Sequence, residues 1–397
     1  MVVSSAVSGA VPVPVNTPAA VQFTHEGELI WIGLQLVTVA LALALLATGL
    51  GARLKSAIAR LTGARPWLTL TLFAWAYLTL QDLVVLPLRY VDEVGRWTRW
   101  AAQGVPAQPL PTWLAGQAAS LLVLMAASAA LLWIPFRLIE RRPRAWPLLL
   151  TAMILPAFAA VLLAWQVVLL PMTTRFEPLA DKALAAELQA MARRCGAGTV
   201  PVLVGGNDNT VVGLGPTSRI LIAPWALKLQ TRPELVTTIA HELKHYRMGD
   251  NWLALAVVGA LMFAGLVLVQ LGGAAAIRLW GDRFGFADLH DPAALPLIVL
   301  ILLVSWDLAG LPVFNAVQRR VEHEADRFAL EITHGNRPFA QWQATVQPWR
   351  MPEEDWVTRT FLDNHPEQAE RVQFGNDYRP WAEGQPGVYD KVCKPPA

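Results

Sequence analysis

The sequence contains a run whose residue types and spacing could support metal chemistry, His241-Glu242-Leu243-Lys244-His245. The two histidines are four residues apart, so on a helix they share one face, about 5–6 Å apart at Cβ, where both rings can bind one Zn²⁺ ion. Glu242 follows the first histidine and can act as general base toward a metal-activated water. The run predicts a hydrolytic zinc site with His241 and His245 as ligands.

Such a site needs a third protein ligand from elsewhere in the chain. In the metzincin pattern this would be a histidine six residues after His245, but Asn251 stands there. Glu322 and Asp326 lie one turn apart on a predicted helix, so Glu322 can bind zinc while Asp326 orients a ligand imidazole through its free N–H. We therefore expect one Zn²⁺ ion per chain, bound by His241, His245 and Glu322.

Two neighbours of Glu322 are weaker candidates for the third ligand. Glu324 falls on another side of the same helix, about 200° away from Glu322. His323 is a rival ligand, but no carboxylate stands four residues after it to orient its ring.

The composition excludes an ordinary soluble protein. Of the 397 residues, 54% are hydrophobic and 16% are charged, whereas a soluble domain has about 25% charged residues. The apolar residues gather in long runs that approach or exceed the roughly 18–20 residues needed to span a bilayer. We expect six membrane spans, at about residues 29–51, 67–88, 113–134, 147–171, 252–277 and 293–314. The net charge of +2 excludes a strongly basic nucleic-acid-binding protein.

The expected fold is mainly α, a polytopic α-helical membrane protein with a split zinc metalloprotease domain that contains a small β-sheet. Strand-like runs at 200–204 and 219–222 supply the sheet. The expected order is a disordered N-terminal tail (1–28), a four-span region (29–172), a first protease part with the HExxH helix (173–251), a transmembrane hairpin (252–314) and a second protease part with the third zinc ligand (315–397).

Loop charges predict how the chain is oriented in the membrane. The loops 52–66 and 135–146 are rich in Lys and Arg, whereas the N-terminal tail has no Lys or Arg. The positive-inside rule then places both loops in the cytoplasm, and the first protease part emerges on the outer side. The Ala- and Leu-rich composition favours a bacterial source. The expected location is therefore a bacterial inner membrane, and the loop charges place the active site on the periplasmic side. Cys195 and Cys393 are too few for a disulfide framework. They could pair if both faced an oxidising compartment, but free thiols are the favoured expectation.

These motifs together resemble the integral-membrane zinc metalloproteases typified by the CAAX prenyl protease and the HtpX-type quality-control protease, which belong to the gluzincins. The shared pattern is an HExxH helix, a membrane hairpin and then NxxSRxxExxAD. Residues 315–326 of this chain are NAVQRRVEHEAD, which departs from that pattern at Gln318. Lys244 also departs from it, because a small residue usually precedes the second histidine.

The resemblance implies roles for residues outside the two helices. Residues 364–372, NHPEQAERV, are similar to the family's His-Pro segment. By that resemblance His365 and Arg371 would lie beside the zinc and stabilise the oxyanion. The stretch from Asn209 to Gly213 looks like the family's edge strand, which would bind an extended substrate backbone.

The predicted function is that of a membrane-embedded zinc endopeptidase acting on membrane-associated or unfolded protein or peptide substrates. Three alternatives remain open at this point. Residues 241–250, HELKHYRMGD, also resemble the BlaR-type sensor metalloproteases. The zinc could instead stabilise a non-catalytic scaffold, or the intramembrane acids Asp82 and Asp307 could serve a transporter.

Overall fold

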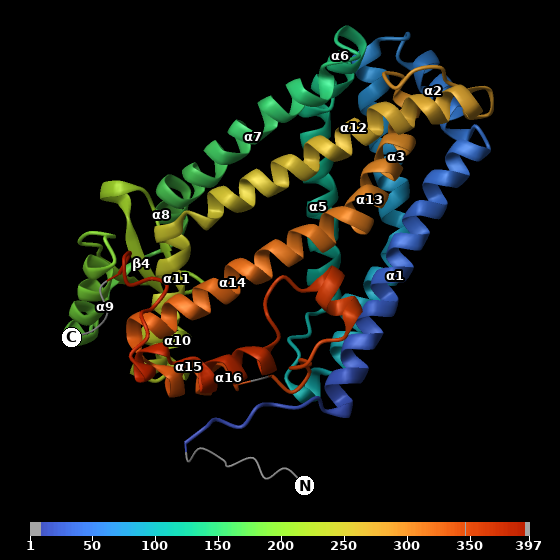
Figure 1. Cartoon of the computed structure of the whole chain (residues 1–397). Helices are drawn as coiled ribbons and strands as arrows, with labels where there is room; N and C mark the ends of the chain where they lie inside the picture. The colour runs from blue at the N-terminus through green and yellow to red at the C-terminus, as the bar shows by residue number, and fades with distance from the viewer. Residues whose placement is uncertain (1–8, 346, 394–397) are drawn as a thin grey trace.

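Long helices dominate the computed structural model of the chain, which describes residues 9–345 and 347–393 (Figure 1). Within these residues, six helical stretches are long and apolar enough to cross a membrane, as the sequence predicted. They are Pro18–Ala47, Pro66–Arg99, Leu110–Arg141, Trp146–Thr173, Asp250–Phe284 and Pro292–Thr333. The chain is therefore an integral membrane protein of mainly helical fold.

Four of these stretches precede the first protease part. They include the helices α1 (Pro18–Ala47), α3 (Pro66–Tyr90), α5 (Leu110–Leu131), α6 (Trp133–Arg141), α7 (Trp146–Ala164) and α8 (Leu170–Thr173). Helix α2 (Leu50–Leu61) lies between the first two stretches. The short helices α2 and α6 carry the basic loops and lie together at the end of the molecule opposite the small sheet (Figure 1).

The last two stretches form a hairpin that runs directly into the helices carrying the predicted zinc ligands. Helix α12 (Asp250–Phe284) follows α11 (Arg232–Met248) after one glycine, and α13 (Leu295–Ser305) continues through a π-helical turn into α14 (Leu311–Thr333). Glu322 and Asp326 thus lie on an extension of a membrane helix. The boundaries that we placed at 251/252 and 314/315 fall inside these helices, so the protease unit and the hairpin share a continuous backbone.

The protease unit has its own small sheet, with strand order β1-β2-β4-β3. Its strands are β1 (Glu177–Pro178), β2 (Val202–Val204), β3 (Thr210–Val212) and β4 (Arg219–Ile222). Strands β2 and β4 pair in parallel, whereas β3 pairs antiparallel with β4, so β3 lies at an edge of the sheet. This free edge faces the side of the molecule where the site is found.

Two buried apolar clusters hold the two ends of the molecule. One packs the sheet against α9 (Lys182–Arg194), α11 and α14, with Leu188, Ile220, Leu243 and Phe328 fully buried. The other lies where α2, α3, α6, α12 and α13 meet, around Phe73 and Trp146. In the protease unit, burying such side chains stabilises the fold by about 1.5–3 kcal/mol per large apolar residue.

The structure corrects the prediction of a disordered tail over residues 1–28. Helix α1 begins at Pro18, because Thr17 caps it by accepting a hydrogen bond from the Ala20 N–H and proline suits the first turn. Residues before the helix also pair with the second protease part: the Val11 N–H donates to Asn376 and the Asn16 amide donates to the Glu353 carbonyl. The first eight residues of the predicted tail lie outside the described residues.

The prediction of free thiols is wrong. Cys195 and Cys393 form a disulfide across 198 residues of sequence, and both are buried in the core of the protease unit. The pairing depends on the fold, because the segment after α16 (Gln368–Asp377) returns along α14 to reach the end of α9. Sequence spacing alone carries no signal for it.

Candidate active site

Helix α11 carries the HExxH residues, and its ends are well defined by the sequence. Thr231 and Glu234 form a capping box at its start, and Pro233 occupies the first turn. The helix ends at Gly249, whose φ of +69° is a left-handed conformation that favours glycine. The chain turns there and continues as α12, which places Asp250 beside the helix it has just left.

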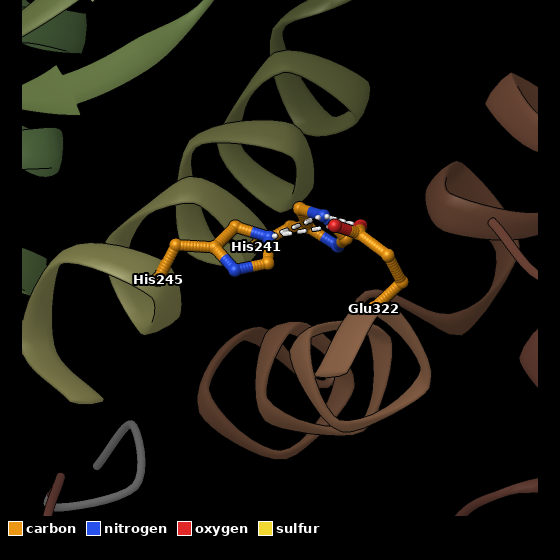
Figure 2. Close-up of side chains that lie close together, drawn as sticks. All are labelled: His241, His245 and Glu322. Carbon is orange, nitrogen blue, oxygen red and sulfur yellow. Dashed lines mark hydrogen bonds and ion pairs between the residues drawn. The ribbon is translucent and has the colours of Figure 1, made fainter. Parts of the chain in front are cut away.

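Figure 2 shows that His241 and His245 point from α11 toward Glu322 of α14. The Nε2 atom of His241 lies 3.0 Å from a carboxylate oxygen of Glu322, and that of His245 lies 3.6 Å from the other oxygen. The three ligand atoms all lie within 4.8 Å of one another. Two imidazoles and one carboxylate are the donor set of many catalytic zinc sites. The residues present therefore fit a zinc ion.

Each of these histidines is held from behind by an aspartate. The Nδ1 atom of His241 lies 2.9 Å from Asp326, which is fully buried, and that of His245 lies 2.7 Å from Asp250. Such outer carboxylates fix the ring orientation and keep Nε2 directed at the metal position.

Each aspartate is in turn paired with a buried cation. Arg371 binds Asp326 through two nitrogens, at 2.8 and 2.6 Å, and Lys244 binds Asp250 at 2.7 Å. Lys244, the residue that departs from the family pattern, also donates to the carbonyl of Val321 on α14. These contacts explain how a lysine is accommodated inside the helix packing, since its charge is neutralised there.

The electrostatics of α11 depend on burial and on these carboxylates. Burial raises the pKa of Glu242, although the nearby His241 and His245 rings oppose the shift. Burial by itself would lower the pKa of His241, but hydrogen bonds to Asp326 and Glu322 raise it to about 9. The two carboxylates therefore favour a positive charge at this position.

The site opens into a cleft of about 610 Å³. Its lining includes Glu242, His365 and the residues of strand β3. The edge of β3 therefore borders the space in front of the three candidate ligands. An extended peptide could pair with that edge and pass over the site.

The side chain of Asn209 is engaged in hydrogen bonds within the protein through both its oxygen and its nitrogen. Its oxygen accepts from the Ala223 N–H and its amide donates to Gln230. It therefore ties the start of β3 to the segment after β4. The backbone of the strand, rather than this side chain, is available to a substrate.

The two residues expected at the oxyanion are placed differently. His365 is about half exposed, and its Nε2 atom lies 3.7 Å from Glu322. Arg371 has both Nε and Nη2 engaged with Asp326, so its main contact is with the residue that holds His241. The structure thus brings His365 next to the candidate ligands and places Arg371 behind them.

Sequence reasoning missed Asp250 as the partner of His245 and Lys244 as the partner of Asp250. The Gly249-Asp250 pair directly after the HExxH helix could have indicated the contact with Asp250. A glycine in the left-handed conformation ends the helix and lets the next residue return toward its last turn. The salt bridge of Lys244 with Asp250 could not be seen from helical spacing, because the two residues belong to different helices.

Comparison with known proteins agrees with this geometry. The sequence pattern of Peptidase family M48 matches residues 178–376, half of the chain. An uncharacterized metalloprotease, YhfN of Bacillus subtilis (strain 168), is 24% identical over 310 residues, covering 76% of this chain and 72% of its own. The crystal structure of S. mikatae Ste24p is similar in fold, with a TM-score of 0.69 and 17% identity, covering 90% of this chain and 88% of that one. The chain therefore belongs to peptidase family M48, and it is a membrane metallopeptidase.

Proposed function

We propose that this M48 peptidase is a zinc endopeptidase that cleaves peptide bonds in membrane-associated or unfolded proteins and peptides. The observation that carries the proposal is the convergence of His241, His245 and Glu322 within 4.8 Å, with Glu242 beside them in a cleft. These three residues would hold one Zn²⁺ ion per chain. A bound zinc ion supplies Lewis-acid polarisation of the scissile carbonyl and lowers the pKa of water.

Glu242 is the general base in this proposal. It takes a proton from the attacking water and later passes it to the leaving amine nitrogen, while the C–N bond breaks. Its raised pKa suits both steps, because a carboxylate that is partly buried accepts a proton more readily than one in water.

His365 is the proposed hydrogen-bond donor to the oxyanion that forms when water attacks the carbonyl. Its ring lies beside Glu322 and is exposed to the cleft. Arg371 acts through Asp326: it neutralises this buried carboxylate and holds it against His241. The substrate backbone would pair with the edge of β3.

The proposed location is a bacterial inner membrane, with the active site on the periplasmic side. The basic loops on α2 and α6 lie at the end away from the sheet and the HExxH helix (Figure 1), and the positive-inside rule places that end in the cytoplasm. The Cys195–Cys393 disulfide supports the same orientation, because disulfides persist in oxidising compartments.

A fusion of alkaline phosphatase after the last residue should be active, and a fluorescent protein fused there should be dark. The reverse pattern would place the protease in the cytoplasm.

The test of the activity compares the wild type with Glu242→Gln on an unfolded protein such as casein. The variant keeps the size of the side chain and leaves the three candidate ligands intact. We expect the wild type to cleave and the variant to lose at least about 10³-fold in rate, with equal zinc contents. Equal cleavage by both proteins would mean that Glu242 is not the general base, and no cleavage by either would favour a scaffold in which zinc has a structural role.

A further inference from the structure

A second cluster of metal-ligand side chains lies where α1 meets the C-terminal protease segment. His25 and Glu28 are three residues apart on one face of α1, and Asp355 precedes the π-helical turn η7 (Thr358–Leu362). The Nε2 atom of His25 lies 3.1 Å from Asp355. One ligand atom from each of the three residues lies within 4.8 Å of the other two. Among the described residues, the only other group of this kind is the site on α11 and α14.

The carboxylates of this cluster are held in place by groups around them. One oxygen of Asp355 accepts from the Val357 and Thr358 N–H groups, at 2.9 and 3.0 Å, which leaves the other directed at His25. One oxygen of Glu28 accepts from the Thr358 hydroxyl at 2.7 Å. In each carboxylate, protein donors fix one oxygen and the other remains for a ligand, as in the outer shell of known metal sites.

The charge balance of the cluster calls for a cation. Glu28 is only 7% exposed, yet its carboxylate lies beside that of Asp355. In the described part of the chain, no lysine or arginine pairs with either: the nearby Arg99 binds Glu26, and Arg359 binds Glu367. His25 is the one basic partner, and it is charged only when protonated. Two carboxylates this close, one of them buried, repel each other unless a proton or a metal ion lies between them.

The donor set selects the kind of metal ion. One imidazole and two carboxylates suit Zn²⁺ or a similar divalent transition metal. Ca²⁺ prefers six to eight oxygen ligands, and Mg²⁺ prefers oxygen ligands with several retained waters. We propose that His25, Glu28 and Asp355 form a second Zn²⁺ site, separate from the proposed catalytic one.

A metal ion at this position would connect two distant parts of the chain. His25 and Asp355 are 330 residues apart in sequence, and farther along the same two segments the ring centroids of Trp31 and Phe361 lie 5.6 Å apart. The segment that follows η7 leads directly to Asp363 and His365. Zinc at the second site would therefore anchor the segment that carries His365 to the first membrane helix.

The test counts zinc in the full-length, detergent-purified protein after metal stripping, reloading with zinc alone and gel filtration. We expect two zinc ions per chain in the wild type and one in His25→Ala, whose side chain is half exposed. Asp355→Asn, which keeps an oxygen for the Val357 and Thr358 N–H groups, should bind the second zinc at least tenfold more weakly. Glu353→Gln, an exposed neighbour outside the cluster, is the matched control and should bind two.

Combined variants distinguish zinc bound at the second site from zinc bound at the proposed catalytic site. Glu322→Ala should retain the second zinc, and Glu322→Ala combined with His25→Ala should bind none. One zinc in the wild type, or a second zinc that survives both His25→Ala and Asp355→Asn, would overturn the second site. Failure of the catalytic site would appear instead as a zinc count that Glu322→Ala does not change.

Discussion

Lys244 and Asp250 form a salt bridge of 2.7 Å behind the face of α11 that carries the two candidate ligands, and Asp250 also binds the Nδ1 atom of His245. The arrangement repeats on the other histidine, where Arg371 binds Asp326 and Asp326 binds His241. Each candidate ligand ring is thus oriented by a carboxylate whose charge a buried cation neutralises.

Replacement of Asp250 by asparagine should weaken zinc binding. The asparagine cannot supply the negative charge that fixes the His245 ring, and loss of such a partner typically lowers metal affinity about 10–100-fold. Competition with a chromogenic chelator would measure the change. Asp282→Asn, an exposed position on the same helix, should leave the affinity unchanged. An unchanged affinity in Asp250→Asn would mean that the aspartate does not orient the ligand.

Replacement of His365 by alanine should lower kcat without removing zinc. If the ring stabilises the oxyanion, its loss should cost about 10²–10³-fold in kcat. Because the His365 side chain is about half exposed, its removal should leave the fold intact. Steady-state kinetics on a peptide substrate and a zinc count would be compared with those of Asn364→Ala. A change in KM alone would assign His365 to substrate binding.

The stability of the protein should fall as the pH rises toward 8. Burial and the neighbouring Asp363 raise the pKa of Glu354 to about 8. Since the unfolded-state pKa is near 4.5, the folded state binds the extra proton. This stabilisation is fully present below about pH 4.5 and is lost as the pH rises through 8, by an amount on the order of 1–2 kcal/mol after solvent screening.

Glu354→Gln is the matched variant, because a glutamine stays neutral across this range. The melting temperature of the variant should rise relative to that of the wild type as the pH increases from 5 to 8.5. A constant difference would show that Glu354 has an ordinary pKa in the folded protein.

The disulfide predicts how the two cysteines respond to reagents. A maleimide should label neither Cys195 nor Cys393 in the oxidised, denatured protein, and both after reduction. Cys393→Ser should lower the free energy of unfolding by about 2–4 kcal/mol, since the link closes a long loop in the unfolded chain. Adding Cys195→Ser to that variant should cost little more. Labelling of the oxidised protein would contradict the pairing.

The parts of this protein that follow from local pattern could be predicted from its sequence. Apolar runs identified the six membrane helices, and the spacing of His241 and His245 placed both rings on one face. Glu322 was identified through the turn that relates it to Asp326. In each case the relevant residues lie on one helix, where periodicity carries the information.

The contacts that were missed join segments far apart in the chain. Cys195 meets Cys393, and His25 meets Asp355, only because the end of the chain folds back along α14 and α1. The early start of α1 at Pro18 was missed for a different reason, since its first turns are polar and resemble a tail. The hydrogen bond that caps the helix at Thr17 stabilises its first turn in spite of the polar residues.

His241, His245 and Glu322 are proposed to hold one catalytic zinc ion. The most direct measurement is the zinc content of purified His25→Ala, which isolates this site, with and without Glu322→Ala, and with Glu324→Gln as a control on the same helix. We predict one zinc ion per chain in His25→Ala and in the control, and none when Glu322 is replaced. A full equivalent of zinc that persists without Glu322 would mean that Glu322 is not a ligand.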